Sequence, residues 1–470
     1  MTASPDVKAS HVDPTDVPRE AAARIAGDIL VNARAMATLV DLTDSCGPRL
    51  TGTGGYTKAS AWALAQFRSV GVDAALETFT LDHAWSPGGA AGRILAPVER
   101  PIHVASFGLS PGTPASGLRG LLVKLDDVSP SALASRGDAV KGKIAYFARR
   151  LLWKEWATHP MQRLADAGAI AVLVSGGRPN DAVDRIVCRG PNDSVCTRPT
   201  FVVGLEDAAS LDRLLTTGQV SLEVSSTAVI GGAVESANVI AEIRGRELPD
   251  ESVLLGAHLD AWDLATGAQD DGSGVVQVIE AARALRALSV PPRRTVRFAL
   301  WGGEEQDFIG SRAYAAAHAN EMDRVVAYLN SDNGAGSPIG WAVGGGREDI
   351  VAAARPLAST FLSGLGADTV ESSMVCDSDD CPFWTRGVPT LSLEVDMSEY
   401  MSVHHLSSDT IDKVKPGALT EGAAVMAITA YALAELPRRI GDRADSASIE
   451  KRLAGTSVLV EVTDKGLWKH

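Results

Sequence analysis

A series of short apolar runs, each followed closely by acidic residues or histidine, most constrains the fold of this chain. Short apolar runs between turn signals predict buried strands. Ligands of open α/β sheets bind at the carboxyl ends of the strands, so the polar residues that follow these runs are expected to meet at one edge of a sheet. The runs cover 252–255, 296–301, 325–329 and 389–395, and the residues that follow them are His258 and Asp260, then Glu304 and Glu305, then Asp332, then His404 and His405.

Segments with a helical apolar pattern separate these runs. The pattern over 275–288 predicts a helix, and Asp270–Gly274 directly before it predicts an acidic turn that opens this helix. Strands that alternate with helices predict an α/β fold, with a mostly parallel sheet and helices on both faces.

Each polar motif taken alone has an ordinary structural explanation. A histidine after a strand is commonly a core residue, and Asp-Asp-Gly-Ser-Gly is commonly a turn with a helix cap. Together, and at strand ends, the motifs predict a metal site, because zinc binds imidazole and carboxylate ligands.

Composition narrows the classes of function. The chain has 470 residues, 45% of them hydrophobic, and a net charge of −14. The negative charge argues against nucleic acid and against an anionic membrane surface as partners. We find no apolar run of transmembrane length and no apolar signal core near the amino terminus, so we expect a cytoplasmic protein. If the sequence was trimmed of an export signal, the protein would instead be exported.

The cysteines leave two interpretations open. Cys188 and Cys196 flank one polar loop, and Cys376 and Cys381 flank another. Each pair closes a small disulfide loop if the protein is exported, and both stay reduced in a cytosol. Cys46 has no evident partner.

We predict a discontinuous main domain with an insert. Residues 1–17 are expected to be a disordered tail, and 18–97 with 229–440 form the main domain, beginning with one long helix over 19–43. Residues 98–228 form a smaller β-rich α/β insert that contributes no metal ligand, since it has no histidine paired with carboxylates at strand ends. Residues 441–470 are a carboxyl-terminal extension with an edge strand at 458–462.

The order of the polar motifs resembles that of a known family. His-x-Asp, Asp-Asp-x-x-Gly, Glu-Glu, Asp and His-x-x-x-Asp-Thr, in this order, are typical of dinuclear-zinc exopeptidases of the aminopeptidase and carboxypeptidase Q type. The turn Gly47-Pro48-Arg49 is similar to one in the same family, and the insert resembles a protease-associated domain. The matching residues are His258 with Asp260, Asp270 with Asp271, Glu304 with Glu305, Asp332, and His405 with Asp409 and Thr410.

The resemblance implies the zinc exopeptidase fold and two Zn²⁺ per chain. One ion would bind His258, Asp332 and a shared Asp270, and the other would bind His405, Glu305 and the second oxygen of Asp270. Glu304, which neither ion needs, would be the general base towards a metal-bridging water. Asp260, two residues after His258, is expected to orient that imidazole, and Asp409 to do the same for His405.

The function implied is hydrolysis of dipeptides or short peptides, in the manner of carboxypeptidase Q. An aminopeptidase is the main alternative. Asp379, Asp380 and Arg347 are candidates for binding a charged peptide end. Two further alternatives share the fold: a glutaminyl cyclase with one zinc, and a binding protein without catalysis. The expected partner is a peptide substrate, with no nucleic acid and no membrane, and a homodimer is left open.

Overall fold

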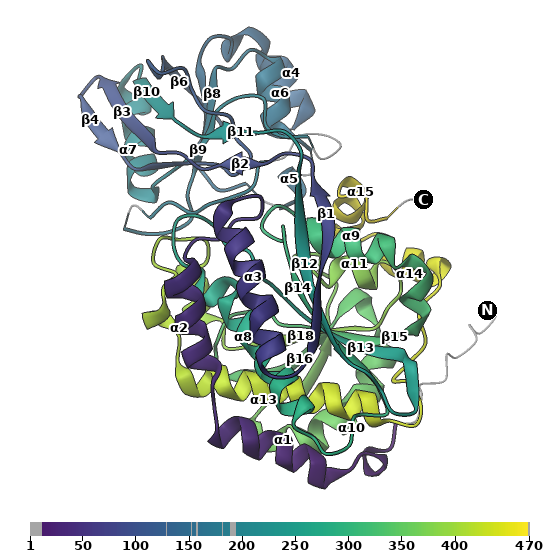
Figure 1. Ribbon diagram of the computed structural model, residues 1–470. Coiled ribbons are helices and arrows are strands. Elements are labelled where there is room, and N and C mark those ends of the chain that lie inside the picture. Colours follow the sequence, from purple (N-terminus) through teal and green to yellow (C-terminus); the bar gives the residue numbers. More distant parts are fainter. Residues whose placement is uncertain are drawn as a thin grey trace, which may run out of the picture. The chain divides into compact units, whose positions relative to one another are not determined.

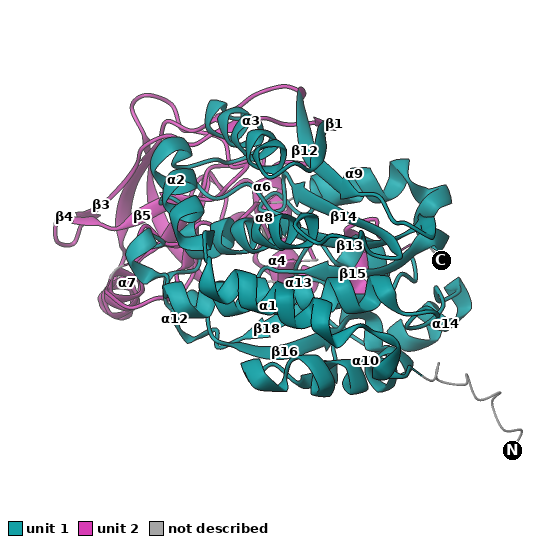
Figure 2. Ribbon diagram, turned by 60° about the horizontal axis from the view of Figure 1, so that its bottom comes forward, with its two compact units in different colours: residues 1–79, 235–404, 409–459 teal, residues 80–234, 405–408, 460–470 magenta. Residues whose placement is uncertain are grey.

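The computed structural model describes residues 12–468, except 128, 152, 157, 181 and 189–193. The chain divides into two compact units (Figure 2). Unit 1 comprises Met1–Phe79, Glu235–His404 and Asp409–Leu459. Unit 2 comprises Thr80–Val234, His405–Ser408 and Val460–His470. The insert predicted at 98–228 falls inside the longest segment of unit 2.

Unit 1 is built on an eight-stranded sheet with the order β1-β12-β14-β13-β15-β18-β16-β17 (Figure 1). Its central strands β14, β13, β15 and β18 are parallel neighbours, whereas β12 and β16 run antiparallel to β14 and β18. The mostly parallel sheet predicted from the sequence is therefore confirmed. The strands are β1 (Asp73–Leu81), β12 (Val234–Ile243), β13 (Leu248–His258), β14 (Arg294–Trp301), β15 (Val325–Asn330), β16 (Pro338–Val343), β17 (Thr369–Ser372) and β18 (Thr390–Val395).

Both faces of this sheet are buried, which is why its strands are continuously apolar. Along β13, Val253, Leu255 and Ala257 belong to the larger core cluster, while Leu254 belongs to a second cluster on the opposite face. Helices therefore cover both faces, as the α/β prediction required. The helices that contribute to the larger cluster are α1 (Arg19–Val31), α2 (Ala35–Cys46), α3 (Gly54–Ser69), α8 (Ser273–Arg286), α10 (Glu348–Phe361) and α13 (Pro416–Glu435), and α9 (Ile309–Ala317) and α11 (Cys381–Trp384) contribute to the second.

Contrary to the expectation that no apolar run reaches transmembrane length, helix α13 is long and apolar enough to cross a membrane by length and composition alone. However, 89% of its most apolar window is buried inside unit 1, where it packs against α8 and α1. Such burial is typical of a core helix, whose apolar residues face protein on every side.

Unit 2 has its own eight-stranded sheet, in the order β4-β3-β10-β6-β7-β8-β9-β5. Strands β6, β7, β8 and β9 are parallel neighbours, and successive residues of β7 alternate between two core clusters. The strands are β3 (Ala90–Ala96), β4 (Arg100–Ile102), β5 (Val104–Ser106), β6 (Leu118–Leu125), β7 (Ile144–Phe147), β8 (Ala171–Ser175), β9 (Thr200–Val203) and β10 (Ser221–Ser226), and the main helices are α4 (Pro130–Arg136), α6 (Pro160–Asp166) and α7 (Leu205–Thr217).

Three local predictions were wrong. The helix predicted over 19–43 is two helices, because α1 ends at Val31 and α2 begins at Ala35. The edge strand predicted at 458–462 is helix α15 (Val458–Asp464). Residues 12–17 are not a disordered tail, since Val12 and Val17 are buried in the core of unit 1; the rest of the predicted tail, 1–11, lies outside the described residues.

Both cysteine pairs form disulfide bonds. Cys188 is bonded to Cys196 in unit 2, and Cys376 to Cys381 in unit 1, while Cys46 is a free thiol. Structural disulfides persist in oxidising compartments, so they fit the exported alternative better than the cytoplasmic expectation.

Candidate metal centre

Three neighbouring parallel strands bring the predicted site residues to one edge of the sheet of unit 1. His258 is the last residue of β13. Glu304 and Glu305 follow the end of β14, and Asp332 follows the end of β15. Since β13 lies between β14 and β15, the three carboxyl ends adjoin.

His258 lies at the centre of the site and is buried. Its Nε2 is 3.1 Å from Asp270 Oδ1 and 3.2 Å from Asp332 Oδ1. Its Nδ1 lies 3.0 Å from the backbone carbonyl of Asp260. A proton on Nδ1 that is donated to this carbonyl leaves the Nε2 lone pair for a metal ion.

Glu305 completes a first group of possible ligands with His258 and Asp270, whose donor atoms lie within 4.8 Å of one another. A second group within the same limit contains His258, Asp271 and Asp332. Asp271 already accepts the backbone N–H of His258 at 3.1 Å and of Gly274 at 2.9 Å. Its carboxylate therefore links the start of α8 to the end of β13. Because the carboxylate of Asp271 is used in this way, Asp270 is the better candidate for a shared ligand.

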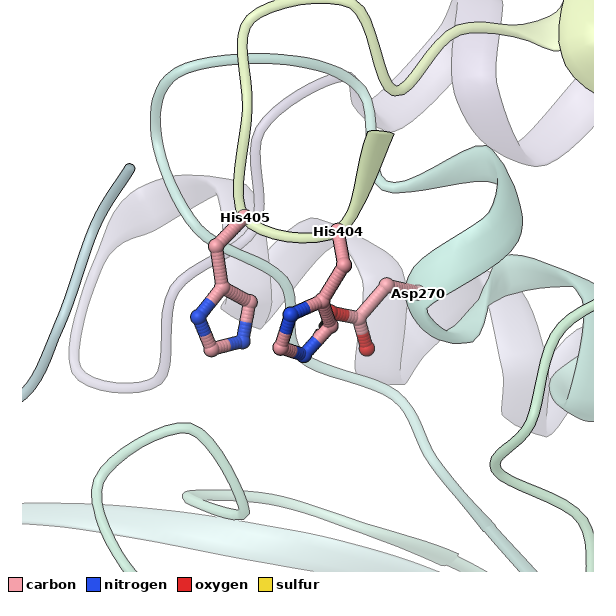
Figure 3. Close-up of side chains that lie close together, drawn as sticks. All are labelled: Asp270, His404 and His405. Carbon is pink, nitrogen blue, oxygen red and sulfur yellow. Dashed lines mark ion pairs between the residues drawn. The ribbon is translucent and has the colours of Figure 1, made fainter. Parts of the chain in front are cut away.

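A histidine outside the predicted set of metal ligands also approaches Asp270. His404 follows helix α12 (Ser398–Val403), and its Nε2 is 3.7 Å from Asp270 Oδ2 (Figure 3). The predicted ligand His405 comes next, with a left-handed φ of 62°, and it begins the segment His405–Ser408 that groups with unit 2. The two histidines and Asp270 form a third group of possible ligands, whose donor atoms lie within 4.8 Å of one another (Figure 3).

Asp409 holds the backbone of the acidic turn. Its carboxylate accepts the N–H of Gln269 at 2.7 Å and that of Asp270 at 3.2 Å. Burial and the nearby charge of Asp270 raise the pKa of Asp409 to about 6, although both backbone hydrogen bonds lower it. Asp409 therefore supports the backbone at Asp270. The sequence-based prediction was that it orients the imidazole of His405.

Asp260 connects two loops of the site. Its Oδ1 accepts the backbone N–H of Glu304 at 3.2 Å, while the distance from Oδ1 to His258 Nδ1 is 3.7 Å. The backbone carbonyl of Asp260, at 3.0 Å, therefore orients the imidazole, and its carboxylate orients the loop of Glu304.

The excess of buried carboxylates fits a site for cations. Burial raises the pKa of Glu304 well above its ordinary value; His258 lowers it, and the charges of Asp332 and Asp379 raise it further. Burial and the charges of Asp332 and Asp270 likewise raise the pKa of Asp271, against a lowering effect of His258. Buried charges of one sign are costly unless they are paired or bind metal ions, and this donor set of imidazole and carboxylates suits zinc.

Residues 238–430, which contain this site, match the model of peptidase family M28. These residues are therefore similar to an M28 peptidase domain. The predicted resemblance to zinc exopeptidases is thereby confirmed, and the protein is a metallopeptidase.

Relatives of known structure or function show the same similarity over most of the chain. Carboxypeptidase Q of Homo sapiens is 28% identical over 423 residues, which cover 86% of each protein. A peptidase M28 precursor of Shewanella amazonensis has a crystal structure with a TM-score of 0.81 and 28% identity, covering 91% of this chain and 99% of that one. The zinc aminopeptidase of Bacillus subtilis shares the fold, with a TM-score of 0.65 and 22% identity. The similarity covers 88% of this chain and 97% of that one.

A disulfide-closed loop supports Asp332. Ser378, between Cys376 and Cys381, donates its hydroxyl hydrogen to Asp332 Oδ2 at 2.5 Å, and Asn330 Nδ2 donates to Ser378 Oγ at 2.8 Å. The cysteine spacing is visible in the sequence, but this connection to Asp332 is not.

The candidates for binding a charged peptide end have structural partners. Asp379 is buried and accepts a hydrogen bond from Ser311, and Asp380 accepts one from Thr390 at 3.2 Å. Arg347 pairs with Asp349 and donates to the carbonyl of Asp442, so the structure gives it a role in holding loops together.

Proposed function

We propose that the protein is a zinc-dependent exopeptidase that binds two zinc ions and hydrolyses dipeptides or short peptides. The observation that carries the proposal is the convergence of His258, Asp270, Glu305 and Asp332 at one sheet edge, with Glu304 beside them. His258, Asp270 and Asp332 would hold one ion. Asp270, Glu305 and one of the two consecutive histidines, His404 or the predicted His405, would hold the other.

Bound zinc would supply Lewis acidity towards the attacking water and the scissile carbonyl. Glu304 would accept the proton of that water and pass it to the leaving amine. Its Oε2 lies 3.9 Å from His258 Nε2, close to the ligands, and its side chain is 11% exposed, so it can reach a water beside them. Asp260 would hold the Glu304 loop through the backbone N–H that it accepts.

We favour the carboxypeptidase Q-like specificity over that of an aminopeptidase. The support is the extent of similarity, since the carboxypeptidase Q of Homo sapiens matches over 86% of this chain. The aminopeptidase alternative is supported by the shared fold of the Bacillus subtilis enzyme.

Two assays test the proposal. Dipeptides and longer peptides, each free, amino-blocked or carboxyl-blocked, are offered to the purified protein. Carboxyl blocking should abolish hydrolysis if the carboxypeptidase-like proposal holds, and amino blocking should abolish it for an aminopeptidase. Metal analysis separates the other classes: two zinc ions per chain are expected, one would favour a glutaminyl cyclase, and none would favour a binding protein.

We further infer that the protein works in an oxidising compartment. The support is the disulfide pairing of four of the five cysteines. Thiol titration of protein purified from its natural source should find one free thiol per chain, and five would contradict the inference.

A further inference from the structure

The turn after α2 contains an arginine that is entirely buried. Arg49 is 0% exposed, and each of its three guanidinium nitrogens donates to a backbone carbonyl. Nε donates to Leu259 at 2.6 Å, Nη1 to Thr266 at 2.5 Å and Nη2 to Gly267 at 2.8 Å. All three carbonyls belong to the loop between His258 and Asp270.

Residues 259–267 form neither helix nor strand, although most of them are buried. Buried carbonyls without hydrogen-bond partners are costly. Arg49 donates to three carbonyls of this loop at once, and one of them, that of Gly267, also accepts the N–H of Gly272 at 3.0 Å. Gly267 has a φ of 58°, and a Cβ there would lie 2.3 Å from the Cβ of Ala261 and 2.7 Å from the carbonyl oxygen of Asp270, so the loop requires glycine at this position; Arg49 Nη1 would be 3.0 Å away.

Two residues later, the same turn holds the other acidic loop. Thr51 is buried, and its Oγ1 accepts the backbone N–H of Gly303 at 2.7 Å. Gly303 directly precedes Glu304 and Glu305. One short turn thus contacts the loop that carries Asp270 and the loop that carries Glu305.

We propose that Arg49 and Thr51 are positioning residues that fix these two loops in the arrangement that binds metal. The inference rests on the proposed function. It assigns the Gly-Pro-Arg turn to the metal centre, and not to recognition of a substrate carboxylate. An arginine that bound a substrate carboxylate would need accessible donors, whereas Arg49 is buried and its nitrogens already donate to carbonyls.

The test compares conservative variants by the dissociation constant of zinc, measured by competition with a chelator well below the unfolding temperature. Arg49→Lys keeps the charge but cannot reach three carbonyls with a planar fork. Thr51→Val keeps the shape but removes the acceptor, and Thr51→Ser restores it. Removing a group that supports a metal ligand weakens metal binding about 10–100-fold. We expect Arg49→Lys to bind zinc more weakly by this factor and Thr51→Val also to bind it more weakly. Thr51→Ser should recover the wild-type zinc affinity.

A second buried arginine provides the matched control. Arg294, at the start of β14 and so at the opposite end of that strand from the site, is 2% exposed and donates to Glu251 and to the carbonyl of Leu436. Arg294→Lys should lower the thermal stability without changing the dissociation constant of zinc. With saturating zinc, Arg49→Lys should recover part of its kcat and keep a KM within about threefold of wild type.

The outcomes separate the inference from the proposed function. Unchanged zinc affinity in both Arg49→Lys and Thr51→Val would overturn the inference. A large rise in the KM of Arg49→Lys with wild-type zinc affinity would also overturn it, because it would indicate that Arg49 binds the substrate. A wild-type protein that binds no zinc would instead overturn the proposed function.

Discussion

Glu304 and Glu305 are adjacent, yet the geometry separates their chemistry. Glu305 belongs to the group of possible ligands with His258 and Asp270, whereas Glu304 has its backbone held by Asp260. We expect Glu304→Gln to retain both zinc ions and lose roughly 10²–10⁴-fold in kcat, because an amide cannot accept the proton of water. Glu305→Gln should lose one ion first and regain activity in part with added zinc.

The measurement is zinc stoichiometry beside kcat for both variants, with and without added zinc. A Glu304→Gln protein that loses zinc and is rescued by it, beside a Glu305→Gln protein that keeps both ions, would reverse the two roles.

Asp270 should matter more for metal binding than either histidine that follows α12. Its Oδ1 lies 3.1 Å from His258 and its Oδ2 lies 3.7 Å from His404, so its loss should affect the proposed ligands of both ions. Asp270→Asn should retain less zinc after dialysis than His404→Ala or His405→Ala. The histidine variant with the larger loss identifies the ligand, and equal losses in Asp270→Asn and that variant would show that Asp270 is not shared.

At the scale of elements, the loop closed by Cys376 and Cys381 should contribute to zinc affinity. Ser378 in this loop donates a hydrogen bond to Asp332, and opening the loop frees the serine to move. The variant with both cysteines changed to serine should bind zinc about tenfold more weakly in chelator competition. The matched control replaces Cys188 and Cys196, whose disulfide lies in unit 2, and should bind zinc as the wild type does.

Glu251 joins β13 to β14 and to the segment after α13. It accepts Arg294 Nε at 2.6 Å and Arg439 Nη2 at 2.9 Å. Burial alone would raise the pKa of Glu251, but these hydrogen bonds hold it below its ordinary value of 4.5. A carboxyl with a lowered pKa in the folded state stabilises the fold above its unfolded pKa, and this contribution is lost as the pH falls through the folded pKa.

At pH 7, Glu251→Gln should therefore unfold at a lower urea concentration than the wild type. Its free energy of unfolding should be lower by about 1–2 kcal/mol, after allowance for the partial exposure of Glu251. The difference between the two proteins should shrink as the pH falls below about 4.5. Glu247→Gln is the control: Glu247 is 47% exposed, so its pairs with Arg246 and Arg293 should contribute less. A constant difference between pH 7 and pH 4 would contradict the assignment.

At the scale of the whole molecule, zinc should stabilise one unit selectively. His258, Asp270, Glu305 and Asp332 all belong to unit 1, and unit 2 has its own sheet and core clusters. Chelation should lower hydrogen-exchange protection in β13 and β15 but leave β7 and β8 unchanged, because a ligand stabilises the folded state that binds it. Equal loss of protection in β7 and β8 would show that the fold of unit 2 also depends on the metal.

The sequence alone predicted the fold class and gave the candidate site residues because both depend on local patterns. Strands buried on both faces appear as continuous apolar runs, and polar residues directly after such runs mark the carboxyl edge of the sheet. His258, the pair Glu304 and Glu305, and Asp332 became candidates for this reason, whereas the choice of Glu305 as a ligand came from the family resemblance. The amphipathic pattern over 19–43 could not show the break at 32–34, because α1 and α2 are each apolar on one side.

The tertiary structure alone decided which residues support the ligands. Arg49 lies 210 residues before Leu259 and Ser378 lies 46 residues after Asp332, and no local pattern links such positions. His404 and His405 are adjacent in the sequence, and only the folded chain brings the donor atoms of both close to Asp270. The chemistry of the ligands is a property of residue type and spacing, whereas their orientation depends on hydrogen bonds from distant segments that form only when the sheet and its helices are packed.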